Sequence, residues 1–213
     1  MFFSVIIPAH NAAKTIGKTL ASIEQQSFKD YEIIVVCDAC EDETVDIVKS
    51  HPNVRHRVVS NHTDGLTRNN GLDIAHGQWV LFIDADDWYL HEFVFEQLHN
   101  KILQELGART RLDVLIYGMI WGHVGYTGAR SKIGTLYPHC TNKCWRREFI
   151  GDTRFPDKKV ANDAGFHERM MAKNPVMVEW DMPIYYYDYL APDSKSVSLG
   201  RTAEKTKMYW SRH

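Results

Sequence analysis

Several features that define other classes of protein are missing from this sequence. No apolar run approaches the roughly 20 residues that a membrane-spanning helix needs, so we expect no transmembrane segment. The net charge is only -2, which gives no electrostatic reason to expect a nucleic-acid partner. There is no internal repeat and no low-complexity stretch. With 44% hydrophobic residues, the chain can bury the core of an ordinary globular domain.

The first residues also lack the marks of a secretion signal. MFFSVIIPAHN is apolar, but it has neither a basic start nor a cleavage site of small residues. We therefore interpret it as a first β-strand. The expected location is a reducing cytoplasm, with peripheral contact to a membrane through the basic stretch 201–213 as a second option.

Cysteine is scarce and falls into two groups. Cys37 and Cys40 form a C-x-x-C pair, and Cys140 and Cys144 form a C-x-x-x-C pair. The two pairs could form a split zinc site, and the first pair could be a redox couple. We favour the third interpretation, four free thiols, because zinc-binding pairs usually lie closer together in sequence.

Apolar runs alternate with amphipathic stretches through the first 120 residues. The predicted strands are residues 3–7, 33–37, 54–59, 79–83 and 114–120, and the predicted helices are residues 12–26, 41–50, 66–75 and 91–106. We expect Pro8 to end the first strand and Asn11 or a neighbour to cap the first helix. This alternation indicates an α/β fold with a mostly parallel central sheet flanked by helices. In such sheets, ligands bind beyond the carboxyl ends of the strands.

The second half is less regular. The glycine-rich residues 122–134 are predicted to form a loop, 141–150 and 163–173 helices, and 176–180 and 184–189 short strands. We divide the chain into a donor-binding half (1–120), a smaller acceptor-side half of the same domain (121–190) and a polar tail or linker (191–213). A second interpretation makes the chain the N-terminal domain of a longer protein, with further domains after residue 213.

An acidic cluster directly follows the apolar strand at 79–83. Asp84, Ala85, Asp86 and Asp87 place three carboxylates within four residues, and a bound cation would offset their repulsion. Mg²⁺ and Mn²⁺ bind carboxylate oxygens together with substrate phosphates. The alternative is a solvated acidic turn before the next helix. We favour the first interpretation, in which Asp84, Asp86 and Asp87 hold Mn²⁺ or Mg²⁺.

Polar residues follow the other predicted strands. His10 and Asn11 follow the first, Asp38 follows the second, and Arg68 lies in the segment after the third. We expect them to gather with the acidic cluster at one rim of the sheet. An aromatic ring, a carboxylate, a cation and a metal site are the parts that hold a nucleoside diphosphate.

Four stretches of the sequence resemble family 2 glycosyltransferases, which have the GT-A fold. They are SVIIPAHNAAKTIGKTLASIEQQSFKDYEIIVVCDACEDET, GLTRNNGLDIAHGQWVLFIDADDW, TNKCWRREFI and ANDAGFHERM, and together they span most of residues 2–173. The ordered series is more specific than any one of them. The resemblance implies a Rossmann-like GT-A domain that moves a hexosyl-type sugar, with inversion, from a UDP-sugar to a hydroxyl of a glycan acceptor.

The resemblance also implies roles for individual residues. Pro8, Ala9 and His10 would surround the uracil, with Asn11 beside them, and Asp38 would accept the uracil N3–H. Arg68 would lie near the donor nucleotide, and Asp84 and Ala85 near the ribose. Asp86 would bind the cation that bridges the two phosphates, and Asp87 would support the cation or the donor sugar.

Asp163 would be the general base that deprotonates the acceptor hydroxyl. Its structural alternative is an N-cap of the helix that starts at Ala164. On the acceptor side, His123, His139, Trp145, Trp180 and residues 185–187 could line a sugar groove or simply pack in the core, and His139 could be a metal ligand.

Three positions depart from the family pattern. His10 stands where tyrosine is usual, Cys37 where an acidic residue is common, and Asn162 where glutamate commonly precedes the base. They leave open a different function, a non-catalytic nucleotide-sugar or carbohydrate-binding module with a degenerate site. A nucleotidyltransferase would need a glycine-rich phosphate loop that PAHNAAKT lacks, and a zinc protein leaves the acidic cluster unexplained.

Overall fold

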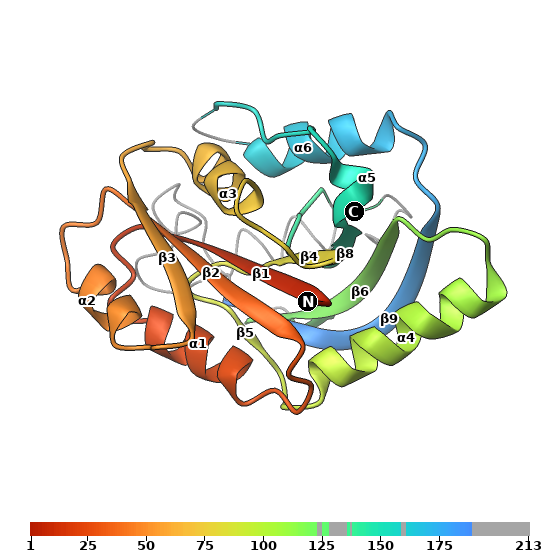
Figure 1. Cartoon of the computed structure of the whole chain (residues 1–213), viewed down its shortest axis with the longest axis horizontal. Helices are drawn as coiled ribbons and strands as arrows, with labels where there is room; N and C mark the ends of the chain where they lie inside the picture. The colour runs from red at the N-terminus through yellow and green to blue at the C-terminus, as the bar shows by residue number, and fades with distance from the viewer. Residues whose placement is uncertain (123–124, 128–135, 137, 159–160, 189–213) are drawn as a thin grey trace.

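The computed structural model describes residues 1–122, 125–127, 136, 138–158 and 161–188 (Figure 1). Its strands are β1 (Phe3–Ala9), β2 (Tyr31–Asp38), β3 (Val54–Val59), β4 (Trp79–Phe82), β5 (Trp88–Tyr89), β6 (Val114–Trp121), β7 (Gly125–Thr127), β8 (Lys143–Arg146) and β9 (Met177–Tyr187). Its helices are α1 (Ile16–Glu24), α2 (Thr44–Lys49), α3 (Asp64–Leu72), α4 (Val94–Ala108), α5 (Arg147–Ile150) and α6 (Asn162–Met171). No helix in these ranges is long and apolar enough to cross a membrane.

The strands form one sheet in the order β3-β2-β1-β4-β8-β6-β9-β5, with β7 paired to β6. The pairs among β3, β2, β1 and β4 are all parallel, as is the pair between β6 and β9. β8 is antiparallel to both of its neighbours and joins the two halves. The predicted α/β class, with a mostly parallel sheet flanked by helices, is confirmed.

Helices cover both faces of the sheet. Figure 1 shows α1, α2 and α4 on one side and α3, α5 and α6 on the other. In β1, Phe3, Val5 and Ile7 face the first group of helices, whereas Ile6 faces the second. Each fully buried side chain of this size contributes about 1.5–3 kcal/mol to stability. Because both faces are occupied, the ends of the strands are the places left for a ligand.

β1 continues past Pro8, where we expected it to end. The carbonyl of Ile6 accepts a hydrogen bond from the amide of Ile83, on the β4 side of the strand. Backbone groups two residues apart point to the same side, so Pro8 also faces β4. Since β4 ends at Phe82, no partner lies opposite Pro8 there, and its missing N–H costs no ladder hydrogen bond.

The predicted cap of the first helix is also wrong. α1 begins at Ile16, and its N-cap residue is Thr15, which makes no side-chain capping hydrogen bond. Asn11 instead adopts a left-handed backbone with φ of 47°, and its Oδ1 accepts the amide of Glu41. Asparagine tolerates this conformation better than most residues. Asn11 therefore joins the loops after β1 and β2 at the carboxyl rim.

Predictions for the second half needed the most correction. Residues 141–150 were expected to be helical, but they form β8 followed by the single turn α5. The two strands predicted at 176–180 and 184–189 are one strand, β9, whose register against β6 shifts near Gly118. Residues 125–127 of the predicted loop form β7. The predicted tail 191–213 lies outside the described residues.

Candidate active site

The carboxyl ends of β1, β2 and β4 bring the predicted rim residues together. The Nδ1 atom of His10 lies 2.7 Å from the carbonyl oxygen of Asp38. Across the rim, Arg68 pairs with Asp84, which follows β4. These contacts link residues that are far apart in sequence, as parallel crossover topology predicts.

Asp38 is almost fully buried, and its carboxylate organises a loop. One oxygen accepts the amides of Asn61 and His62 at 2.6 and 3.0 Å, and the other accepts the hydroxyl of Thr67 at 2.7 Å. His62 needs this support because its backbone is left-handed, with φ of 58°. A carboxylate has about four acceptor positions and three are used here, so the role of Asp38 toward uracil stays a prediction.

Arg68 connects two aspartates that come from different parts of the chain. It lies on α3 with only 5% exposure. One guanidinium nitrogen donates to Asp84 Oδ1 at 2.5 Å, and the other lies 3.5 Å from Asp163 Oδ1. Its Nε has no hydrogen-bond partner among the described residues. A buried guanidinium needs such carboxylates for compensation, so the three side chains stabilise one another.

The aspartates after β4 have different surroundings. Burial raises the pKa of Asp84, and the charge of Arg68 opposes that rise. Burial also raises the pKa of Asp86 to about 7, and the neighbouring charge of Asp84 adds to this. Within the described residues, no ion pair or side-chain hydrogen bond neutralises the Asp86 carboxylate. Asp86 is therefore the carboxylate of this cluster that would gain most from a cation.

Asp87 is fully buried and both of its oxygens are occupied. The hydroxyl of Tyr185 donates to one, and the amide of Asp188 donates to the other at 2.8 Å. The hydroxyl of Thr19 on α1 also holds the backbone carbonyls of Ala85 and Asp87, at 3.0 and 2.8 Å. These contacts anchor β9 to the acidic turn through Asp87, and its role as a support for the cation or the donor sugar stays a prediction.

The donor set fits a divalent cation. Asp84 and Asp86 offer carboxylate oxygens, and Asp86 is a partly buried acid without a protein counter-charge in the described structure. Mg²⁺ and Mn²⁺ sites in enzymes often use one or two carboxylates and complete their shell with substrate phosphates. The described residues contain no group of three or more potential ligands that could hold a metal by themselves. A cation would therefore need the donor's phosphates as well.

Asp163 lies in the first turn of α6, and its side chain is 25% exposed. The N-cap of this helix is Ala161, which makes no side-chain cap, so the alternative role of Asp163 as a cap is wrong. Its Oδ1 lies 3.5 Å from both Arg68 and the Sγ of Cys140, and its Oδ2 accepts the amide of Cys140 at 3.5 Å. The carboxylate is thus held from two sides and still reaches solvent, as a general base requires.

Lys143 is a functional candidate that sequence reasoning missed. It is fully buried at the start of β8, close to Asp163 and His167 of α6. Burial lowers its pKa to about 7, although the nearby Cys140 and Asp163 favour the charged form. Burial and the charge of Lys143 together lower the pKa of His167, one turn after Asp163, to about 4. The signal was the Asn-Lys pair in TNKCWRREFI, but we read that stretch as a helix.

The acceptor-side candidates divide into core and rim. Trp145 is completely buried against Phe166 and belongs to the core. Tyr185 is also buried, and its hydroxyl donates a hydrogen bond to Asp87. Trp121, His139 and Tyr187 form a ring cluster, with centroids 5.3–5.8 Å apart. His123 lies outside the described residues. The sugar-groove role of the rim rings, of Trp180 and of Tyr186 stays a prediction.

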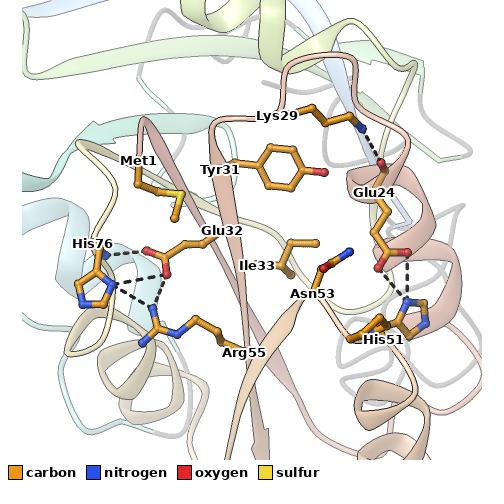
Figure 2. A pocket seen from close by; sticks show the side chains of 11 residues that line it. Met1, Glu24, Lys29, Tyr31, Glu32, Ile33, His51, Asn53, Arg55 and His76 are labelled. Atoms are coloured by element: carbon orange, nitrogen blue, oxygen red, sulfur yellow. Dashed lines mark hydrogen bonds and ion pairs between the residues drawn. The ribbon is translucent and has the colours of Figure 1, made fainter.

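A depression of about 1030 Å³ lies at the opposite, amino-terminal edge of β1–β3 (Figure 2). Its charged side chains pair with one another: His51 with Glu24 at 3.0 Å, and Arg55 with Glu32. Because the two carboxylates are already matched by basic groups, this pocket does not compete with the acidic rim as a donor site. The four cysteines are free thiols.

Comparison with known proteins points to one family. Residues 4–109, about half of the chain, match the model described as glycosyl transferase family 2. Glycosyltransferase GlyA of Streptococcus pneumoniae is 36% identical over 105 residues, and amylovoran biosynthesis glycosyltransferase AmsB of Erwinia amylovora is 32% identical over 144 residues. These matches cover 47% and 64% of this chain, but 15% and 46% of the relatives. The chain thus spans less than half the length of these curated relatives.

Solved structures agree in fold. Staphylococcus aureus TarS 1–349 in complex with UDP superposes with a TM-score of 0.75 and 26% identity, over 87% of this chain and 60% of that one. The complex with UDP-GlcNAc gives a TM-score of 0.79 with 25% identity, over 93% and 61%. The mannosyltransferase PcManGT from Pyrobaculum calidifontis, in complex with GDP-Man and Mn²⁺, shares the fold, with a TM-score of 0.68 and 18% identity over 92% and 59%.

Proposed function

Because residues 4–109 form a glycosyl transferase family 2 domain within a GT-A fold, we propose that this chain moves a hexosyl-type sugar from a UDP-sugar to a hydroxyl of a glycan acceptor. We propose further that the reaction depends on Mn²⁺ or Mg²⁺ and inverts the anomeric configuration. TarS, similar over most of the chain, has been solved with UDP and with UDP-GlcNAc, which supports a uridine nucleotide as donor.

One observation carries the proposal. The buried guanidinium of Arg68 pairs with Asp84 at the donor rim and with Asp163 on α6. A donor-side carboxylate and the proposed base therefore lie within the reach of a single side chain. A sugar carbon between a leaving diphosphate and an attacking hydroxyl requires this closeness of its two binding regions.

The chain's own residues supply the remaining chemistry. Asp86 and Asp84 would hold the cation, which when bound neutralises charge that develops on the departing diphosphate. Asp163 accepts the proton of the acceptor hydroxyl as that oxygen attacks the anomeric carbon from the face opposite the diphosphate. The bond to the acceptor forms as the bond to the diphosphate breaks, so a single displacement inverts the configuration and needs no covalent enzyme intermediate.

The donor base would lie against the loops after β1 and β2. His10 is exposed there, and its Nδ1 is fixed by the carbonyl of Asp38, so its ring has a defined orientation. We propose that Pro8, Ala9 and His10 contact the uracil and that Asn11 maintains the shape of the loop. The imidazole would stack less extensively than the larger tyrosine ring usual in the family.

Asn162 replaces the glutamate that commonly precedes the base, which was one reason to consider a degenerate binding module. Its side chain is buried and packs against Gly65, so it fills space between α6 and α3. The contacts of Asp163 with Arg68 and Cys140 remain in place beside it. We therefore favour the enzyme over the binding module. We also propose a cytoplasmic location, which suits four free thiols.

A donor screen tests the function. Purified protein would be titrated by calorimetry with UDP-, GDP- and dTDP-sugars, with and without Mn²⁺, and then assayed for donor hydrolysis and for transfer to oligosaccharides. We expect a UDP-sugar to bind best, to require the cation, and to be hydrolysed slowly. Equal affinity with and without Mn²⁺ would remove the metal site, and binding without any turnover would favour the binding module.

A further inference from the structure

A buried lysine lies next to the proposed base without belonging to the donor or metal sites. Lys143 has no exposed surface and starts β8, the strand inserted between β4 and β6. Its ammonium donates to the carbonyl of His139 at 2.6 Å and to Oδ1 of Asn142 at 2.7 Å. A buried ammonium costs several kcal/mol unless its surroundings compensate it, so its presence at this point needs an explanation.

The two oxygens that it holds belong to the turn 139–142. The same turn is fixed from β6, where the hydroxyl of Tyr117 donates to the carbonyl of Thr141 at 2.7 Å and the Tyr117 amide donates to the carbonyl of Asn142 at 3.0 Å. Lys143 spans the turn from one end to the other, because its ammonium reaches back four residues to His139. The turn is thus braced on both sides.

Cys140, in the middle of this turn, makes the contact with Asp163. Cys140 directs its amide toward Oδ2 and its thiol toward Oδ1 of that carboxylate, each at 3.5 Å. Cys140 is 1% exposed, so its position depends on the turn around it. Arg68 holds the opposite side of the carboxylate. The direction in which Asp163 presents its free lone pairs is therefore set by Arg68 and by the braced turn.

We propose that Lys143 is a positioning residue for Asp163, acting through the turn 139–142 and the Cys140 contacts. This inference rests on the proposed function, because it assumes that Asp163 deprotonates the acceptor. Lys143 itself touches neither substrate nor cation. Its ammonium fixes the turn, and in its protonated form it interacts favourably with the nearby Asp163 carboxylate.

Two variants separate positioning from general stabilisation. Lys143→Met removes the ammonium but keeps most of the length of the side chain. Lys143→Gln keeps N–H donors that can reach either the carbonyl of His139 or Oδ1 of Asn142. Lys101→Met is the matched control, since Lys101 lies on α4, is 21% exposed and pairs with Glu105. Each variant would first be checked for cooperative thermal unfolding.

The kinetic test measures kcat, the KM for the donor and the equilibrium affinity for UDP with Mn²⁺. Misplacing a catalytic group by about 1 Å can cost on the order of 100-fold, so we expect Lys143→Met to lower kcat by about 10–100-fold. Donor KM and UDP affinity should stay within about twofold of wild type, and Lys143→Gln should recover part of the loss. Unchanged kcat in a folded variant, or UDP affinity lost in step with kcat, overturns the proposal.

A chemical test does not depend on activity. Buried Cys140 should become accessible to iodoacetamide when the brace is removed, and peptide mass spectrometry can follow its alkylation with half-buried Cys40 as an internal reference. We expect Cys140 to react about tenfold faster in Lys143→Met, through more frequent local opening, while Cys40 and the Lys101→Met protein are unchanged. Unaltered protection of Cys140 overturns the brace.

The two tests distinguish the two levels of inference. A wild-type protein without any transferase activity would refute the proposed function, while the alkylation of Cys140 would still decide whether Lys143 holds the turn. If Lys143→Met does not fold, Lys143→Gln carries both measurements. A loss of kcat together with faster alkylation supports the proposal, and a wild-type value of either one overturns it.

Discussion

Asp84, Asp86, Asp87 and Asp163 share one kind of side chain but have four different environments. Arg68 neutralises Asp84, Tyr185 and the Asp188 amide occupy Asp87, and Asp86 has no protein counter-charge in the described structure. Asp163 is held by Arg68 and Cys140 and remains partly exposed. Environment therefore distinguishes Asp84, paired with Arg68, from the proposed cation ligand Asp86, the structural anchor Asp87 and the proposed base Asp163.

Substitution of the proposed base should separate binding from chemistry. Asp163→Asn keeps the shape of the side chain but cannot accept the acceptor's proton, so we expect kcat to fall by about 10²–10⁴-fold. UDP affinity with Mn²⁺ should remain close to wild type, because Asp84 and Asp86 are unchanged. Steady-state kinetics and calorimetry measure the two effects, with the exposed Asp152→Asn as a control. Wild-type turnover in Asp163→Asn would exclude it as the base.

Asp86 should matter for binding and stability, because its ionised carboxylate destabilises the metal-free protein. Burial first, and Asp84 second, raise its pKa from 3.8 to about 7. Between these values the folded protein binds a proton that the unfolded chain has released, so stability falls as pH rises through this window and then levels off. Above about pH 7, the folded protein carries a poorly compensated charge.

We therefore expect Asp86→Asn to stabilise the metal-free protein while it abolishes cation-dependent UDP binding. At pH 8 the gain in the free energy of unfolding should be about 1–3 kcal/mol. It should be smaller at pH 5, which lies between the unfolded pKa of 3.8 and the folded pKa of about 7. Urea unfolding at the two pH values and calorimetry with Mn²⁺ provide the measurements. A variant less stable than wild type at pH 8 would contradict the assigned pKa.

At the scale of elements, the turn between α3 and β4 packs closely against β1, the strand that pairs with β4. The amide of Gly77 donates to the Oγ of Ser4 at 2.8 Å, and Ser4 in turn donates to Glu32 at 2.7 Å. A Cβ at Gly77 would lie 2.4 Å from the backbone nitrogen of Ser4 and 2.5 Å from the carbonyl carbon of Phe3. Glycine is therefore required here by the close approach of β1's backbone.

Gly77→Ala should be strongly destabilising for this reason. Because the clash is with backbone, relief requires β1 to move away from the turn, and we expect a loss of about 2–4 kcal/mol. Gly107→Ala is the control: nothing lies near its added methyl group on α4, and helix propensity should make it neutral or stabilising by up to about 1 kcal/mol. Equal melting temperatures for the two variants would refute the packing argument.

The elements of the first half could be predicted because each carries its own local signal. The apolar run at 33–37 lies within β2, the run at 79–83 covers β4 and one residue beyond it, and Val54–Val59 matches β3 residue for residue. β8 could not be predicted in this way. Lys143 is a buried charge, and KCWR gains its strand conformation from pairing with β4 and β6 on both sides, which are distant in sequence. β5, with two residues, is too short to leave a pattern.

The same limit applies to the site. Residues at strand ends, such as Asp38 and Asp84, were found because topology alone brings them to one rim. The contact of Cys140 with Asp163 was not expected, because the turn 139–142 and α6 reach the rim through the antiparallel half of the sheet. The sequence therefore predicted the carboxylates themselves better than the groups that orient them.

At the scale of the whole molecule, the proposed donor and acceptor halves share one sheet. β8, from the second half, pairs with β4 and β6, both from the first. Trp145 and Phe166, also from the second half, pack in the same core cluster as Ile6 and Phe82. Neither half encloses its own core, although the family match ends at residue 109.

We therefore predict that residues 1–122 do not fold alone. Without β8 and β9, β6 loses both of its main neighbours, and the face of β1 and β4 beneath α5 and α6 is exposed to water. The fragment should lack a cooperative melting transition and a near-ultraviolet circular dichroism signal, whereas the full chain should unfold in one transition. Calorimetry and circular dichroism measure both.

Complementation gives the sharper form of this test. Mixing or co-expressing residues 1–122 with residues 123–213 should restore a single transition and cation-dependent UDP binding, because β8 and β9 of the second piece lie on either side of β6 of the first. A fragment 1–122 that melts cooperatively and binds UDP with Mn²⁺ by itself would show that the donor half is an independent domain. In that case β8 and α6 would be additions to a finished core, and the link from Arg68 to Asp163 would join two separately folded units.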